Sequence, residues 1–97
     1  MAEDQKTFGF DEALRLIKEG KRVGRVSWKN ALCVFLVQGS QFMVNRPPLN
    51  QFYPEGTEIT YRPHIDVVNA DHSIGTWSPS NGDVLADDWY ELNPLSA

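Results

Sequence analysis

The sequence predicts an α+β fold: a small antiparallel β-sheet with one amino-terminal amphipathic helix and a long proline-rich loop, assembled as a homo-oligomer. Residues 10–17 place apolar side chains on one helix face, and residues 31–37 form an apolar run typical of a strand buried on both faces. Residues 45–57 follow neither a helix nor a strand pattern. One helix covers only one face of a small sheet, so we expect a second subunit to cover the other.

The composition describes a single domain spanning all 97 residues, which we expect to be ordered over about 8–92, with loose tails at 1–7 and 93–97. The net charge of −4 argues against a general DNA or RNA binder, since such proteins carry a basic surface. The single cysteine, Cys33, excludes an internal disulfide framework and suits a reducing compartment. Without a membrane-length apolar run or a signal peptide, we expect a cytoplasmic protein with no membrane partner.

The first predicted element is a helix over 11–19, which covers the sheet and carries no chemistry. Gly20 is a natural stop for this helix, because glycine readily adopts the conformation that follows a helix end. The apolar side chains that recur at i, i+3, i+4 and i+7 are Phe10, Ala13, Leu14 and Ile17.

The next two strands are predicted at 21–28 and 31–37. The second is apolar throughout, so we place Cys33 in the core. Residues 38–40, Gln-Gly-Ser, are turn formers, and 41–44 is apolar at alternate positions. We therefore predict a hairpin that pairs 31–37 with 41–44.

The loop at 45–57 and the residues after it are stiffened by proline. The residue before a proline is pushed out of the helical region, which holds Arg46, Tyr53 and Arg62 extended. Residues 53–56 match a type I turn, with proline second and glycine fourth. Two interpretations stay open: a stiff binding loop that presents arginine, or a structural crossover with solvated arginines.

The remaining chain predicts mostly short strands. Residues 58–61 alternate, with Ile59 and Tyr61 inward, until Pro63 breaks the ladder, so this strand lies at a sheet edge or bends there. Further on we expect a hairpin of 64–68 with 73–77, a helical turn at 83–88 capped by Asp83 or Asn81, and a last strand at 89–92 with Trp89 in the core.

Signs of an enzyme are few. Cys33 is a core residue rather than a nucleophile, and His72 sits in a turn. His64 and Asp66 share one strand face, because alternate strand residues do. They are either an acid–base pair, half of a metal site, or a structural polar pair. The sequence contains no P-loop, Gly-x-Ser-x-Gly or Cys-x-x-Cys motif, and we expect no cofactor, no metal and no catalytic residue.

Signs of a binding protein are clearer. Trp28 and Trp77, two of three tryptophans, abut polar loops. Aromatic faces stack on nucleobases for about 1–3 kcal/mol each. Arg46 and Arg62 carry the forked guanidinium that suits phosphate. These residue types together are what a nucleotide-like ligand requires. The alternative for each tryptophan is ordinary packing in the core.

The chain resembles the second Thoeris anti-defence family of phage proteins over about residues 8–91. The matching motifs are Phe10-x-Glu12-Ala13-Leu14, Arg25-x-x-Trp28, Phe35-Leu36-Val37, Asn45-Arg46-Pro47-Pro48-Leu49, Tyr53-Pro54-Glu55-Gly56-Thr57-Glu58, Tyr61-Arg62-Pro63-His64-Ile65-Asp66 and Leu85-Ala86-Asp87-Asp88-Trp89. Around Trp77 the family more often has Pro-Trp and a Ser-Gln-Thr-Asp-like run, where this chain has Thr76-Trp77-Ser78-Pro79-Ser80-Asn81. That difference leaves the ligand isomer open.

The resemblance implies a sponge for a nucleotide signal. Members bind cyclic ADP-ribose isomers made by a bacterial TIR-domain enzyme during infection, and they sequester the signal without cleaving it. The Thoeris effector then stays silent. Members are homo-oligomers, typically tetramers, with ligand pockets between subunits, and some hold cyclic oligonucleotides in a separate site. Two alternatives remain: a hydrolase of the same nucleotide that uses His64 and Asp66, and a protein–protein inhibitor of the defence enzyme.

On this reading the ligand-binding residues fall into groups by chemistry. Trp28 and Trp77 stack on or enclose the base, and Phe35, within a matching motif, is counted with them. The residues expected to bond the base or ribose are Asn30, Ser80, Asn81 and Asp83. The residues expected to face phosphate are Arg25, Arg46, Arg62 and His64.

Overall fold

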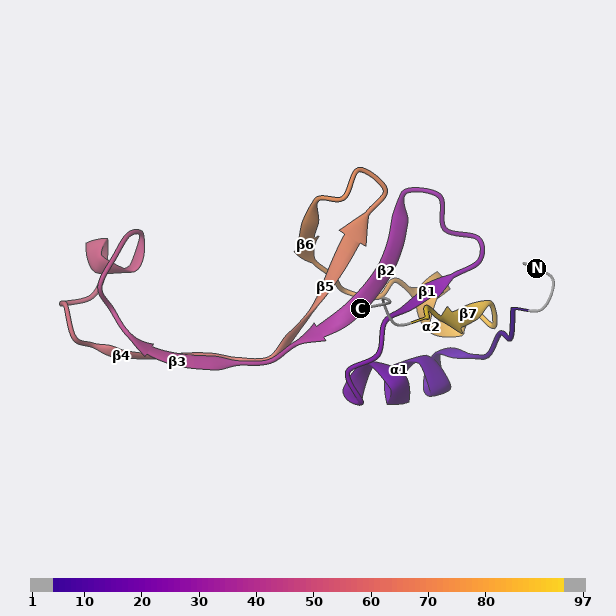
Figure 1. The fold of residues 1–97 in the computed structure, drawn as a ribbon, viewed down its shortest axis with the longest axis horizontal. Helices are drawn as coiled ribbons and strands as arrows, with labels where there is room; N and C mark the ends of the chain where they lie inside the picture. The colour runs from indigo at the N-terminus through magenta and orange to yellow at the C-terminus, as the bar shows by residue number, and fades with distance from the viewer. Residues whose placement is uncertain (1–4, 94–97) are drawn as a thin grey trace.

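The computed structural model describes residues 5–93, so most of the two expected tails (1–7 and 93–97) lies outside the described residues. Figure 1 shows a body at one end and a long, thin arm that extends from it. The longest dimension is 54 Å, against 32 and 24 Å for the other two. No helix among residues 5–93 is long and apolar enough to cross a membrane.

The body is a five-stranded antiparallel sheet with one main helix, which confirms the α+β architecture. The strand order is β6-β5-β2-β1-β7. The elements of the body are α1 (Phe10–Lys18), β1 (Val23–Arg25), β2 (Ala31–Val37), β5 (His64–Asn69), β6 (Ile74–Thr76), α2 (Asn81–Leu85) and β7 (Trp89–Glu91). The predicted hairpin near residue 70 is therefore confirmed as β5 and β6.

The helix α1 packs against β7, β2 and β1 and buries one sheet face. Gly20 has φ +89°, as expected for a glycine that ends a helix. Trp89 has no exposed surface and Cys33 is buried, as predicted. Leu16 joins the core although the predicted helix face did not include it. The buried apolar cluster comprises Ala13, Leu16, Ile17, Val23, Val34, Val67 and Trp89.

The predicted hairpin between 31–37 and 41–44 is wrong, because β2 pairs with β5 instead. The arm is a second sheet in which β3 (Ser40–Met43) pairs with β4 (Glu58–Tyr61). The chain thus runs straight on from β2 into β3, and β4 returns into β5 (Figure 1).

Gly39 and Pro63 form the joint between the body and the arm. Proline has no N–H to donate, so the ladder stops between Tyr61 and His64, as the sequence predicted. A Cβ on Gly39 would overlap the carbonyl oxygen of Tyr61, so the two chains approach closely here. Residues 38–40, which were predicted to form a turn, are therefore extended and approach the segment around Tyr61 and Pro63 closely.

The tip of the arm contains a short 3-10 helix, Leu49–Gln51, where the sequence showed no regular pattern. The β-turn that follows this helix spans residues 54–57, one residue later than the predicted 53–56, because Thr57 N donates to Pro54 O at 3.2 Å. Gly56 is then third rather than fourth, with φ +87°, a position that requires glycine. Tyr61, predicted inward, is 50% exposed, so the aromatic surface of the arm is not covered within one chain.

Candidate functional site

Three tryptophans form a cluster in the body, where Trp77 and Trp89 also meet the ring of Phe10 in α1. The ring centroids of Trp28 and Trp89 are 5.2 Å apart, those of Trp77 and Trp89 6.0 Å, and those of Trp28 and Trp77 6.2 Å. All three pairs meet edge to face, a favoured aromatic geometry. Trp89 is fully buried, whereas Trp28 and Trp77 are half-buried. The two outer indoles therefore pack on the core and still present surface to solvent.

Trp28 lies on a tight turn that follows the end of β1. Trp28 N donates to Arg25 O at 3.1 Å, which closes the turn. Val26 N donates to Asp88 O at 3.0 Å, which ties the turn to the segment before β7. The main chain around Trp28 is thus fixed by hydrogen bonds.

Arg25 lies between two carboxylates. Its Nε donates to Asp88 Oδ1 at 2.8 Å, and its Nη1 donates to Asp83 Oδ1 at 2.9 Å. The hydrogen bond that Arg25 donates to Asp88 raises the pKa of Arg25 despite partial burial, and the bond to Asp83 acts in the same direction. The Arg25 side chain is 20% exposed. The charge of Arg25 is therefore compensated within the chain, whereas the sequence predicted that Arg25 would face a ligand phosphate.

Asp83 is the hub of this network and is only 8% exposed. It forms a capping box with Ser80: Asp83 N donates to Ser80 Oγ at 3.1 Å, and Ser80 N donates to Asp83 Oδ2 at 3.0 Å. The predicted caps, Asp83 and Asn81, are therefore wrong, because Ser80 is the N-cap of α2. Trp89 Nε1 donates to the Asp83 carbonyl at 2.8 Å, and Trp28 Nε1 lies 3.4 Å from Asp83 Oδ1.

The two acids titrate below their ordinary range. Burial raises the pKa of the Asp83 carboxyl, but hydrogen bonds from Ser80, Arg25 and Trp28 outweigh it and the net pKa is lowered. Burial likewise raises the pKa of Asp88, and its hydrogen bonds with Arg25 and Ser27 lower it further than burial raises it. Both acids are therefore charged at neutral pH and hold Arg25 between them.

The structure brings together about half of the residues expected to bind ligand. Around the start of α2 lie Arg25, Trp28, Trp77, Ser80, Asn81 and Asp83. We call the surface formed by Trp28, Trp77, Ser80 and Asn81 the tryptophan site. Ser80 and Asn81 are exposed there, and the Ser80 hydroxyl also accepts the hydrogen bond from Asp83 N.

Asn30, Phe35 and His64 lie elsewhere in the body. Asn30 lines a shallow cavity of about 360 Å³ with the β5–β6 turn. Phe35 of β2 is in register with Asp66 of β5. His64 Nε2 is 3.3 Å from Asp66 Oδ1, which confirms that these two share one face.

The face of the sheet opposite α1 carries an apolar cavity of about 470 Å³. Val34 packs toward α1, so its neighbours Cys33 and Phe35 point to the other face. Burial raises the pKa of the Cys33 thiol, which is consistent with an inert core residue. The cavity is lined by Gly20, Arg22, Leu32, Cys33, Phe35, Leu36, Val68, His72 and Leu92.

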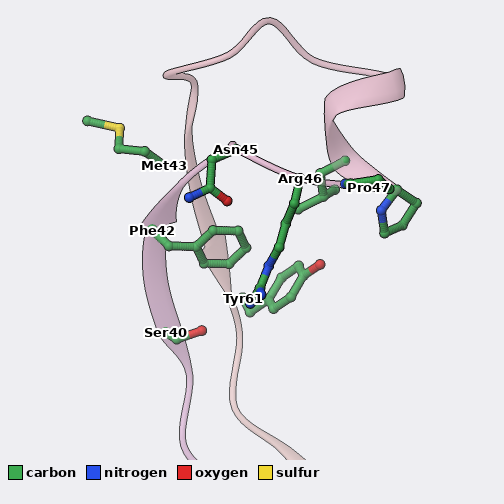
Figure 2. Close-up of a pocket in the computed structure, with 9 residues that line it drawn as sticks. Ser40, Phe42, Met43, Asn45, Arg46, Pro47 and Tyr61 are labelled. Atoms are coloured by element: carbon green, nitrogen blue, oxygen red, sulfur yellow. The ribbon is translucent and has the colours of Figure 1, made fainter.

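Arg46 lies near the tip of the arm, and Arg62 lies at the joint between the arm and the body. A hollow of about 630 Å³ lies near the tip. Figure 2 shows the Arg46 side chain extending beside the ring of Tyr61 in this hollow. Phe42 points into the same hollow and meets Tyr61 edge to face at 5.2 Å. Arg62 is exposed at the joint next to Pro63. Among residues 5–93, Arg46 shares its hollow with Phe42 and Tyr61 and with no tryptophan.

The sequence reading missed Asp88 and the Ser27 amide, which bonds Asp88 Oδ2 at 3.0 Å. A signal was present, because Asp88 directly precedes Trp89 within one of the matching motifs. Nothing in the sequence indicates that position 88 lies opposite position 25. Within residues 5–93 no group of three or more His, Cys, Asp or Glu side chains is placed to hold a metal ion.

Comparison with known proteins agrees with the resemblance. Residues 8–92 match the model of the Thoeris anti-defense 2-like domain. The chain is also 31% identical over 80 residues to the Thoeris anti-defense 2 protein of Bacillus phage SP01, an alignment that covers 82% of this chain and 89% of that protein. The match to the family model includes the tryptophan cluster and the arm. The chain therefore belongs to the Thoeris anti-defense 2-like family.

Proposed function

We propose that this protein binds a cyclic ADP-ribose-type signalling nucleotide and sequesters it without cleaving it, in the cytoplasm of the infected host. The Thoeris effector then remains inactive. Family membership supports a phage anti-defence role. The observation that carries the ligand class is the pair of half-buried indoles, Trp28 and Trp77, whose ring centroids lie 6.2 Å apart beside exposed Ser80 and Asn81.

The tryptophan site supplies what a nucleoside needs. An indole with one side packed on the core is a rigid platform, so little entropy is lost when a base stacks on it. A hydroxyl and an amide beside it can bond a base edge or a ribose. Arg25 supplies little free charge here, because Asp83 and Asp88 compensate it. The phosphate contacts are therefore assigned to Arg46, Arg62 and His64.

Because Arg46 lies near the tip of the arm, away from the tryptophans, we propose that the complete site forms between subunits of a homo-oligomer, a homotetramer by family resemblance. A two-stranded ribbon is marginally stable by itself in water. The arm is such a ribbon and exposes the aromatic side chains of Phe42 and Tyr61. Packing the arm of one subunit on another would cover these rings and bring the arginines near a partner's tryptophans.

The decisive experiment is ligand recovery. The protein is mixed with cyclic ADP-ribose isomers, freed of unbound nucleotide by filtration, heat-denatured, and the released material is identified by mass spectrometry. Intact nucleotide in the released fraction supports sequestration. Trp28→Ala should abolish retention, while Ile74→Ala, which trims an exposed side chain on β6, should retain the ligand.

Other results would replace the proposal. Cleaved nucleotide would indicate a hydrolase, for which the His64–Asp66 pair at 3.3 Å is the candidate acid–base group. His64→Ala would then abolish the cleavage. If no nucleotide is retained or altered, and the protein instead forms a stable complex with the defence enzyme on a sizing column, it is a protein–protein inhibitor.

A further inference from the structure

We infer that Asp88 is a positioning residue for Trp28: through the guanidinium of Arg25 and the amide of Ser27, it fixes the turn that presents the indole to a ligand. The expected effect on nucleotide affinity rests on the proposed function, since it assumes that the tryptophan site binds the nucleotide. The positioning itself is a property of the free protein and is tested separately below.

Asp88 bonds three consecutive residues that lead into Trp28. Its Oδ1 accepts from Arg25 Nε at 2.8 Å, its carbonyl accepts from Val26 N at 3.0 Å, and its Oδ2 accepts from Ser27 N at 3.0 Å. Both carboxylate oxygens are thus used, one on a side chain and one on the main chain. Asp88 thus extends the attachment of the turn to β7 beyond the ladder of β1 and β7, whose last pair is Arg25 with Trp89.

Apart from Trp28, whose indole packs edge to face on Trp89 and Trp77, the turn has little apolar packing. Val26 is 60% exposed, and Ser27 and Lys29 on either side of Trp28 are exposed as well. The hydrogen bonds to Asp88 therefore restrain the backbone of the turn together with the bond from Trp28 N to Arg25 O. Those with an ionised partner are shorter and stronger than neutral ones.

The indole is restrained from a second side through the same guanidinium. Arg25 Nη1 donates to Asp83 Oδ1 at 2.9 Å, and that oxygen lies 3.4 Å from Trp28 Nε1, a long and weak contact. Arg25 therefore links the carboxylate that holds the turn to the carboxylate that faces the indole edge. Removing Asp88 frees one side of this link and leaves the Asp83 capping box intact.

A positioned indole binds better than a mobile one, because the ordering has already occurred before the ligand arrives. Asp88→Asn keeps the shape of the side chain but removes its charge and places an amide group against two donors. We expect about a tenfold loss of nucleotide affinity, from the weakening of the charge-assisted bonds that order the site.

The matched control is Asp71→Asn. Asp71 also accepts two hydrogen bonds, from Ser73 N at 2.9 Å and Ser73 Oγ at 2.6 Å, but it lies in the β5–β6 turn. Its replacement should leave the affinity unchanged. Equal affinity for wild type and Asp88→Asn, or an equal loss in both variants, would overturn the inference.

The readout that separates positioning from general destabilisation is the indole N–H resonance of each tryptophan in the free protein. Trp28→Phe identifies the Trp28 signal by its absence. Asp88→Asn should shift or broaden that signal and leave the Trp89 signal in place, because Trp89 Nε1 bonds the Asp83 carbonyl at 2.8 Å. Displacement of all three signals would mean a structural role and would contradict the inference.

Two further results are informative. If wild type binds no nucleotide, the proposed function fails, while the indole signals still decide whether Asp88 positions Trp28. If Asp88→Asn does not fold, Arg25→Lys provides the second test, because a lysine keeps the charge but has no fork to bond two carboxylates. Arg25→Lys should shift or broaden the Trp28 indole signal as Asp88→Asn does. An unchanged Trp28 signal would show that Arg25 does not connect Asp88 to the position of the indole.

Discussion

The Nε of Arg25 donates to Oδ1 of Asp88 at 2.8 Å and joins two residues that are 63 positions apart in the chain. This bond ties the turn after β1 to the strand that carries the buried Trp89. The half-buried Trp28 and the buried Trp89 are thereby held in one cluster, with ring centroids 5.2 Å apart. The surface proposed to bind a base is thus built on the core of the body.

The first prediction concerns the stability that Arg25 contributes. Arg25→Met should lower the free energy of unfolding by about 2 kcal/mol, because it leaves two partly buried carboxylates without their partner. Urea unfolding followed by circular dichroism measures this. Arg15→Met is the control, since Arg15 pairs with Glu12 and Glu19 on the exposed face of α1 and should matter much less. Equal losses would show that the Arg25 network is no stronger than a surface ion pair.

The second prediction concerns acid stability. Asp83 and Asp88 have lowered pKa values in the folded state, so their contribution to stability is complete above the pKa of the unfolded chain. It is lost as the pH falls through the lower folded values, from about pH 5 downwards. Unfolding midpoints measured from pH 7 to pH 2.5 should therefore drop on the acid side.

Asp88→Asn should flatten part of that acid slope, because one of the two titrating groups is gone. Asp87→Asn, at the neighbouring exposed position, should leave the slope unchanged. An acid slope that is identical in wild type and both variants would mean that these carboxyls do not govern the response to pH.

The third prediction separates the core tryptophan from the outer one. Trp89→Ala should lower stability by about 3–5 kcal/mol, because the side chain is fully buried and its loss leaves a cavity. Trp28→Ala should cost clearly less stability, since the indole is half-buried, and should nevertheless remove nucleotide retention. Denaturant unfolding and ligand recovery on the same preparations test both parts. A Trp28→Ala protein that is folded and still binds would remove Trp28 from the proposed site.

The fourth prediction concerns the joint between body and arm. Gly39→Ala should lower stability by about 1–3 kcal/mol, because the added Cβ would overlap the backbone carbonyl of Tyr61, which cannot move freely. Gly75→Ala on β6 is the matched control: no atom lies within 4 Å of its added Cβ, so stability should be unchanged or slightly increased. Thermal unfolding of the two variants should therefore move in different directions. A tolerated alanine at position 39 would disprove the close approach.

The fifth prediction concerns assembly, and it follows from the proposed oligomer. Replacing Phe42 and Tyr61 with serine should lower the molecular mass found by light scattering on a sizing column. These rings are exposed on the arm of a single chain and are the surface expected to pack on a partner. Ile74→Ser removes an exposed apolar side chain from β6 and should leave the mass unchanged. A monomeric wild-type protein would contradict the proposed assembly from the outset.

Several features were readable from the sequence because their cause is local. Apolar spacing predicted α1 to within a residue of its ends, and the apolar run at 31–37 matches β2. The lack of an N–H in Pro63 predicted the broken ladder. Cys33 and Trp89 were assigned to the core from their apolar neighbours, and both are buried. In each case, the deciding residues lie within a few positions of one another.

The failures share a different cause. Gln38-Gly39-Ser40 has turn composition, yet β2 pairs with β5, a partner roughly thirty residues further along the chain. The cap of α2 is Ser80 rather than Asn81 or Asp83, because the Asp83 carboxylate turns back to the Ser80 amide and inward to Arg25. Composition names the residues that can cap or turn, but it does not choose among adjacent candidates.

The sequence by itself determined the elements, the buried aromatic and the residue types suited to a nucleotide, since periodicity and side-chain chemistry are properties of short stretches. Only the tertiary structure decided which residues share a surface. It placed Trp28 beside Trp77 and enclosed Arg25 between Asp83 and Asp88, while Arg46 lies near the tip of the arm and Arg62 at its joint with the body. Contacts between residues some sixty positions apart depend on how the strands pair, and strand pairing is set by the whole chain rather than by any local pattern.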